Sequence, residues 1–100
     1  MIEPQDIKKL IAYSPGGITS KVLAKGRINV TLFCMAAGTE IGDHTSTKEG
    51  FVYVLEGEGT FILEGQKIGM RPGFFFPMSK NAIHSLTAEK NTSFLLSLCD

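Results

Sequence analysis

The only two histidines of the chain, His44 and His84, are the side chains best suited to bind a transition metal. Five residues separate Gly38 from His44, and His84 stands eleven positions after Gly73. Glycine favours turns, so we expect a β-strand to begin after a turn near each histidine. Non-haem iron oxygenases typically use two histidines and one carboxylate, and catalytic zinc sites use three protein ligands and a water. Two imidazoles therefore predict a site only if another group completes it.

Glu49, Cys34 or a water could supply the missing ligand. In a regular strand Glu49 would point outward, but a β-bulge near Gly50 would turn it inward. A Cys34 thiolate would favour soft metals, although a buried free cysteine is more often a small hydrophobic residue. For the two histidines, metal binding and simple hydrogen bonding inside a barrel both stay open.

Strand periodicity predicts which neighbours share the interior with His44. Residues two apart in a strand point to one face, so Ser46 should face the interior together with His44. Gly50, Val52 and Val54 continue on that face. We expect these residues and Cys34 to line a pocket.

Short strand patterns and turn residues run through the whole chain. Expected strands cover residues 10–13, 20–23, 29–35, 51–56, 60–63, 67–70, 74–76, 82–86 and 93–99. A hairpin is predicted at Gly57-Glu58-Gly59, and residues 5–10 could form one helical turn. This density of short strands indicates an all-β sandwich or barrel of the jelly-roll type.

Size and charge exclude several classes of protein. One hundred residues predict a single domain over 1–100. Ten basic residues balance ten acidic ones without a basic patch, so nucleic acid is not an expected partner. Apolar runs are too short to span a membrane. Residues 1–10 lack an apolar core of signal-peptide length. We therefore expect a cytoplasmic protein in which Cys34 and Cys99 are free thiols.

The stretch 38–59 resembles the first motif of the cupin superfamily. That motif reads glycine, five residues, histidine, any residue, histidine, three or four residues, glutamate, six residues, glycine. Gly38, His44 and Gly57 match it. Ser46 replaces the second histidine, and Gly50 stands in the glutamate position.

The stretch 72–88 resembles the second cupin motif in the same incomplete way. Gly73 and His84 match, whereas Ser79 occupies the proline position, Asn81 a glycine position and Ala88 the final asparagine position. Asparagine is a mild replacement because it tolerates a left-handed backbone. The resemblance covers roughly residues 30–98.

The resemblance implies a small cupin: a double-stranded β-helix barrel that forms a homodimer and uses His44 and His84 toward a divalent metal such as Zn, Fe, Ni, Cu or Mn. Glu49, the neighbour of the glutamate position, joins them only if a bulge turns it inward. Three functions follow as hypotheses. The first is a barrel that binds a small polar or anionic molecule. The second is a metal-dependent dioxygenase, isomerase or lyase acting on a small organic acid or sugar derivative. The third is a regulatory or accessory subunit whose barrel has lost its chemistry. Whether the protein is catalytic stays open, because one fold hosts many functions.

Overall fold

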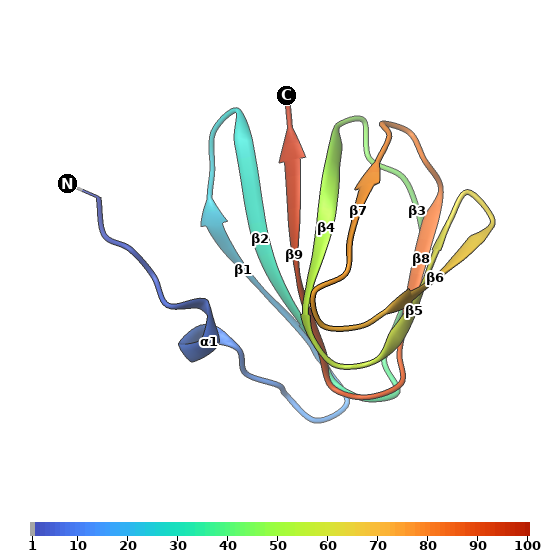
Figure 1. Ribbon diagram of the computed structural model, residues 1–100, viewed down its shortest axis with the longest axis horizontal. Coiled ribbons are helices and arrows are strands. Elements are labelled where there is room, and N and C mark those ends of the chain that lie inside the picture. Colours follow the sequence, from blue (N-terminus) through green and yellow to red (C-terminus); the bar gives the residue numbers. More distant parts are fainter. Residues whose placement is uncertain (1) are drawn as a thin grey trace.

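The computed structural model describes residues 2–100, which form a β-rich body preceded by a short helix and an extended segment (Figure 1). Helix α1 spans Ile7–Leu10. In this part of the chain the strands are β1 (Ile18–Ala24), β2 (Ile28–Met35), β3 (Glu40–His44), β4 (Glu49–Glu56), β5 (Gly59–Leu63), β6 (Gln66–Met70), β7 (Phe75–Met78), β8 (His84–Ala88) and β9 (Thr92–Cys99). None of the helical structure among residues 2–100 is long and apolar enough to cross a membrane.

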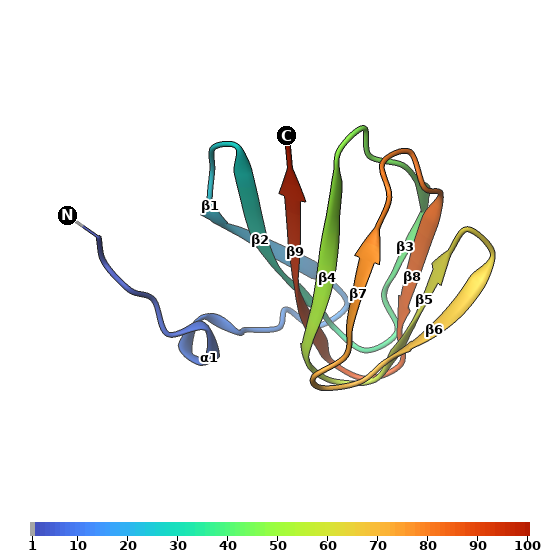
Figure 2. The same ribbon diagram turned by 45° about the horizontal axis from the view of Figure 1, so that its top comes forward.

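The strands form two antiparallel sheets. One has the order β1-β2-β9-β4-β7 and the other the order β3-β8-β5-β6. Both views show the sheets as two neighbouring layers (Figures 1 and 2). The chain passes between the layers several times, and strands distant in sequence become neighbours. This arrangement confirms the predicted all-β jelly-roll fold.

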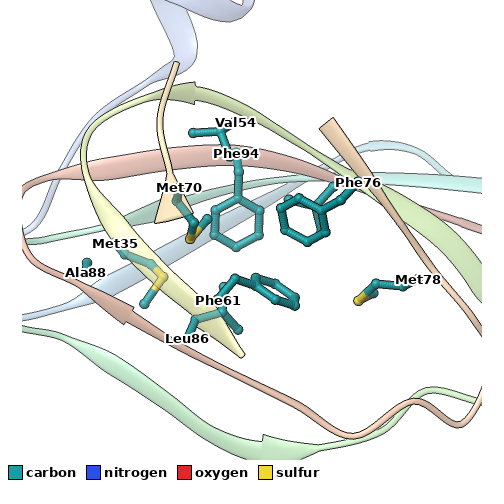
Figure 3. Packing of buried hydrophobic residues seen from close by; sticks show 10 residues of the cluster. Met35, Val54, Phe61, Met70, Phe76, Met78, Leu86, Ala88 and Phe94 are labelled. Atoms are coloured by element: carbon teal, nitrogen blue, oxygen red, sulfur yellow. The ribbon is translucent and has the colours of Figure 1, made fainter. Parts of the chain in front are cut away.

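The interior lies between the two sheets because the strands alternate buried and exposed side chains. Val52 and Val54 of β4 are fully buried, whereas Phe51 and Tyr53 are partly exposed on the other face. Figure 3 shows the core, in which the rings of Phe61 and Phe76 meet edge to face at 4.8 Å. The core cluster comprises Met35, Val52, Val54, Phe61, Met70, Phe76, Met78, Leu86, Ala88 and Phe94.

The strand predicted at residues 10–13 is wrong. The Asp6 carboxylate accepts a hydrogen bond from the Lys8 N–H at 3.1 Å and caps a helical turn there. The following residues up to Tyr13 have no strand partner. The Tyr13 hydroxyl instead donates to Glu56 Oε2 at 2.8 Å. The segment is therefore attached to β4 through a side chain and not through a ladder of backbone bonds.

The hairpin predicted at Gly57-Glu58-Gly59 is also wrong, although the turn itself forms. Strands β4 and β5 on either side of this turn belong to different sheets. Gly57 has a φ of 105°, and a Cβ there would overlap the Asn91 carbonyl oxygen. A glycine is needed because the chain crosses here close to the β8–β9 connection.

The strand boundaries near the histidines differ from the expected ones. His84 begins β8 as predicted for a residue after a turn, and Asn81 takes a φ of 65° in that turn. His44 instead ends a strand, β3, that the sequence patterns did not predict. Gly73 has a φ of 88°, and the Phe74 N–H donates to the Arg71 carbonyl. That turn delays β7 until Phe75.

Candidate functional site

His44 and His84 are direct cross-strand partners in the antiparallel pair of β3 and β8. Their ring centroids are 3.9 Å apart and the ring planes are tilted by 59°. An irregularity in the register lies between Ile41 and His44. In a regular strand, residues three apart would lie on opposite faces. Ile41 and His44 nevertheless line the same cavity, so the irregularity turns His44 toward the barrel interior, as bulges do beside many active sites.

Both imidazoles are held by backbone carbonyls in the same way. His44 Nδ1 lies 2.9 Å from the Gly42 oxygen, and His84 Nδ1 lies 3.0 Å from the Ala82 oxygen. A carbonyl oxygen only accepts hydrogen bonds, so each contact requires the hydrogen to be on Nδ1. In a neutral ring, Nε2 then carries a free lone pair. This tautomer and its backbone support are typical of metal-binding histidines.

The environments of the two rings differ. His84 is buried, with 4% of its surface exposed, and stacks on Phe61 with centroids 5.6 Å apart. Burial lowers the pKa of His84 below its ordinary value of 6.5, the hydrogen bond to the Ala82 carbonyl opposes that shift, and the neighbouring His44 adds to it. His84 is therefore neutral at pH 7. His44 is exposed to solvent, which places it at the mouth of the site.

A cavity of about 140 Å³ adjoins the histidine pair. Apart from the two imidazoles its lining is apolar, which does not match the small polar or anionic ligand that the sequence predicts. The lining residues are Phe33, Ile41, His44, Val52, Phe61, Met78, His84, Leu86, Phe94 and Leu96.

Of the expected pocket residues, Val52 borders this cavity, and the strand patterns did not identify the other apolar lining residues. Phe94 and Leu96 stand two apart on β9 between Ser93 and Ser97, and this period of two residues was the signal that could have identified them. Met78 could not be placed, since the predicted strand ended before it.

The expected pocket residue Ser46 and the proposed metal ligand Glu49 both lie outside this cavity. Ser46 lies in the loop between β3 and β4, where its Oγ accepts a hydrogen bond from the Lys48 N–H at 3.1 Å. Glu49 is exposed and lines a separate hollow beside Lys80 and Asp100. The pairing of β4 with β9 is regular from Glu49 to Val54. The bulge that would turn Glu49 inward is therefore absent from this part of the structure, and the assignment of Glu49 to the site is corrected.

The remaining predicted pocket residues need the same correction. Gly50 and Val54 are on the interior face of β4 but do not border the cavity. Cys34 is buried on the opposite face of the five-stranded sheet, where it borders a hollow with Leu10 and Tyr13. Its sulfur is therefore separated from the histidines by the sheet. Both cysteines are free.

The donor set restricts the metal chemistry that the site supports. Across residues 2–100, His, Cys, Asp and Glu side chains form no group of three or more able to hold a metal ion. The two free Nε2 atoms fit two coordination positions of a transition metal. The other positions would be left to water, to a ligand or to the Met78 thioether, since the lining contains no carboxylate.

Comparison with known proteins agrees with this fold. The family model described as "Cupin domain" matches residues 31–99. This chain belongs to the cupin family. No match was found among curated proteins.

Solved structures share the fold at low sequence identity. A conserved Streptococcus pyogenes protein of unknown function is 21% identical, with a TM-score of 0.88 over 100% of this chain and 89% of that one. A cupin superfamily protein from Desulfitobacterium hafniense is 21% identical, with a TM-score of 0.89 over 99% and 92%. Salicylate 1,2-dioxygenase from Pseudoaminobacter salicylatoxidans, solved with gentisate, is 18% identical; its TM-score is 0.78 over 83% of this chain and 25% of that one.

Proposed function

We propose that the protein is a small-molecule-binding cupin whose cavity takes the ligand and whose His44 and His84 hold a divalent transition metal at the mouth. The pairing of the two rings carries this proposal. Their centroids lie 3.9 Å apart, and both Nδ1 atoms are hydrogen-bonded to backbone carbonyls. Both Nε2 lone pairs are thus available next to a cavity of ligand size. When bound, such a metal would supply Lewis-acid chemistry to a ligand in the cavity.

Zinc titration of chelator-treated protein tests this site. We expect one zinc per chain by calorimetry, and we expect His44→Ala to weaken that binding by at least about tenfold, because one of only two protein ligands is removed. His44 is exposed, so its replacement should leave the fold intact. Glu49→Gln is the matched control, and its zinc affinity should equal that of the wild type. Zinc binding that survives His44→Ala but is lost in Glu49→Gln would overturn the assignment.

The identity of the metal has to be determined separately, and the candidates are Zn, Fe, Ni, Cu and Mn. The softness of imidazole suits several of these ions. Elemental analysis of protein purified without a tag or chelator identifies the ion that the cell supplies. A stoichiometric transition metal is the expected result.

A second candidate function is a metal-dependent enzyme, a dioxygenase, isomerase or lyase, acting on a small organic acid or sugar derivative. The structural likeness to a dioxygenase solved with gentisate favours it. The lack of a carboxylate in the lining weighs against an iron oxygenase, which typically uses two histidines and one carboxylate. Oxygen uptake by Fe(II)-loaded protein with gentisate, compared with His44→Ala, distinguishes the enzyme from the binding protein.

We also propose that two copies of the chain associate through the outer face of the five-stranded sheet. We further propose that the protein lies in the cytoplasm, where reducing conditions keep both thiols free. Phe51, Tyr53 and Phe75 are 36%, 39% and 60% exposed on this face, and Phe51 and Phe75 pack together at 5.1 Å. Clustered apolar side chains of this kind mark interaction surfaces. Light scattering should show a dimer that Phe75→Asp converts to a monomer, whereas Ile83→Asp, at another exposed apolar residue, should remain dimeric.

A further inference from the structure

We propose that the cavity, when free of metal, selects a phenol: a single aromatic ring carrying a hydroxyl group. This inference rests on the proposed small-molecule function and adds the chemical class of the ligand. Three properties of the cavity carry it, namely its volume, its aromatic walls and the hydrogen-bonding character of its two polar atoms.

The volume limits the ligand to about one ring. The cavity measures about 140 Å³. An apolar cavity of about 150 Å³ engineered into another protein binds benzene. A single ring with a small substituent therefore fits inside, whereas a fused two-ring compound does not fit inside completely.

The walls suit an aromatic ring. Phe33 and Phe94 stack at 5.2 Å with nearly parallel planes, and Phe61 stacks with His84. Phe61, Phe94 and Met78 all line the cavity, and Figure 3 shows these three side chains together in the core. Aromatic rings pack favourably against other rings in offset or edge-to-face geometry, and thioether sulfur makes favourable contacts with ring edges.

The polar end of the cavity accepts hydrogen bonds and offers none. His44 and His84 each direct the Nδ1 hydrogen to a backbone carbonyl, so only bare Nε2 atoms remain for a ligand. Of residues 2–100, no Lys or Arg borders the cavity. A hydroxyl donates to such a nitrogen, whereas a carboxylate or phosphate would meet two lone pairs without a balancing charge. The site thus discriminates a phenol from an aromatic acid of the same size.

The inference is tested by calorimetry at pH 8 on EDTA-treated protein with four probes: phenol, toluene, benzoate and 2-naphthol. We expect saturable one-to-one binding of phenol. Toluene should bind about fivefold more weakly, because it loses one hydrogen bond worth about 1 kcal/mol. Benzoate and 2-naphthol should not bind measurably.

Two variants locate the binding. His44→Phe removes an acceptor but keeps an aromatic ring, so phenol affinity should fall to that of toluene. Leu96→Phe fills the cavity and should abolish binding of both, whereas Val22→Phe, at an exposed position, should change neither. Benzoate binding as tightly as phenol, or toluene binding equally well, would overturn the inference. Failure of all four probes in protein that still binds zinc through His44 would overturn the phenol assignment alone and leave the proposed metal site standing.

Discussion

The backbone carbonyl of Ser97 occupies the space in which a side chain at Gly50 would begin. A Cβ built at Gly50 overlaps that oxygen, and Gly50 faces Leu98 of β9 in register. Position 50 is the place where the cupin motif has its glutamate. At the position where the motif has a glutamate, the backbones of β4 and β9 therefore lie too close together to leave room for a side chain.

Gly50→Glu should destabilise the protein and leave the metal site without a new ligand. Overpacking of this kind costs about 1–3 kcal/mol, and Gly50→Ala should already show part of that loss. Gly69→Ala is the matched control, because a Cβ there meets no atom within 4 Å. Urea unfolding measures all three variants. A Gly50→Glu protein as stable as wild type would show that β4 and β9 can separate at this point.

A third imidazole should strengthen metal binding only if it borders the cavity. Met78 borders it, whereas Ser46 lies in the loop after β3. We expect Met78→His to raise zinc affinity more than about tenfold, since catalytic zinc sites use three protein ligands. Ser46→His should leave the affinity unchanged. Zinc calorimetry on both variants decides this, and the opposite ranking would mean that the loop moves into the site.

Stability should fall as the pH drops below about 6.5, because the buried His84 resists protonation. Its pKa is lowered in the folded state, so the unfolded chain binds more protons between the folded pKa and 6.5. The stabilisation linked to neutral His84 is complete above pH 6.5. It is lost as the pH falls toward the lower pKa that His84 has in the folded state. Urea midpoints measured from pH 8 to pH 5 test this, with His84→Gln as the variant in which the histidine-dependent part of the slope should disappear. Equal slopes in the two proteins would contradict it.

The Tyr13 phenol should resist ionisation. Burial raises the pKa of Tyr13 from 10.0 to about 12, and the hydrogen bond and negative charge of Glu56 add to this rise, while Ser93 opposes it. A raised folded pKa gives stability below pH 10 that is lost between pH 10 and pH 12. Tyr13→Phe should abolish this alkaline loss and cost about 0.5 kcal/mol at neutral pH for the missing hydrogen bond. Absorbance titration of tyrosinate formation measures the first effect directly, because tyrosinate forms near the pKa of the phenol. A Tyr13 transition near pH 10 would contradict the prediction.

The two histidines and the jelly roll could be predicted from the sequence because both depend on local spacing. His44 and His84 match motif positions, and the turns at Gly38, Gly57 and Gly73 all have positive φ as their glycines suggest. The complete lining of the cavity could not be predicted. The lining residues come from strands of both sheets. The irregularity in register before His44 cannot be recognised from the alternation of residue types along the strand.

The same limit explains the errors at Glu49 and Cys34. Glu49 would reach the site only with a bulge, yet its strand pairs regularly with β9. Cys34 precedes the first motif in sequence, but the alternation of β2 places it on the outer face of the sheet. In both cases the strand face on which a side chain lies determines whether it reaches the site. Its distance from the motif along the chain does not.

The central place of β9 in its sheet has a consequence for how the chain folds. β9 lies between β2 and β4, and its pairing with β2 joins Ile28 to Cys99. Closing so long a loop costs entropy before any contact is gained, and folds dominated by such distant pairings mature in milliseconds to seconds. Until β9 docks, β2 and β4 each present a bare edge of unpaired amides and carbonyls. During that interval the chain is most exposed to aggregation, so refolding yield should depend steeply on protein concentration.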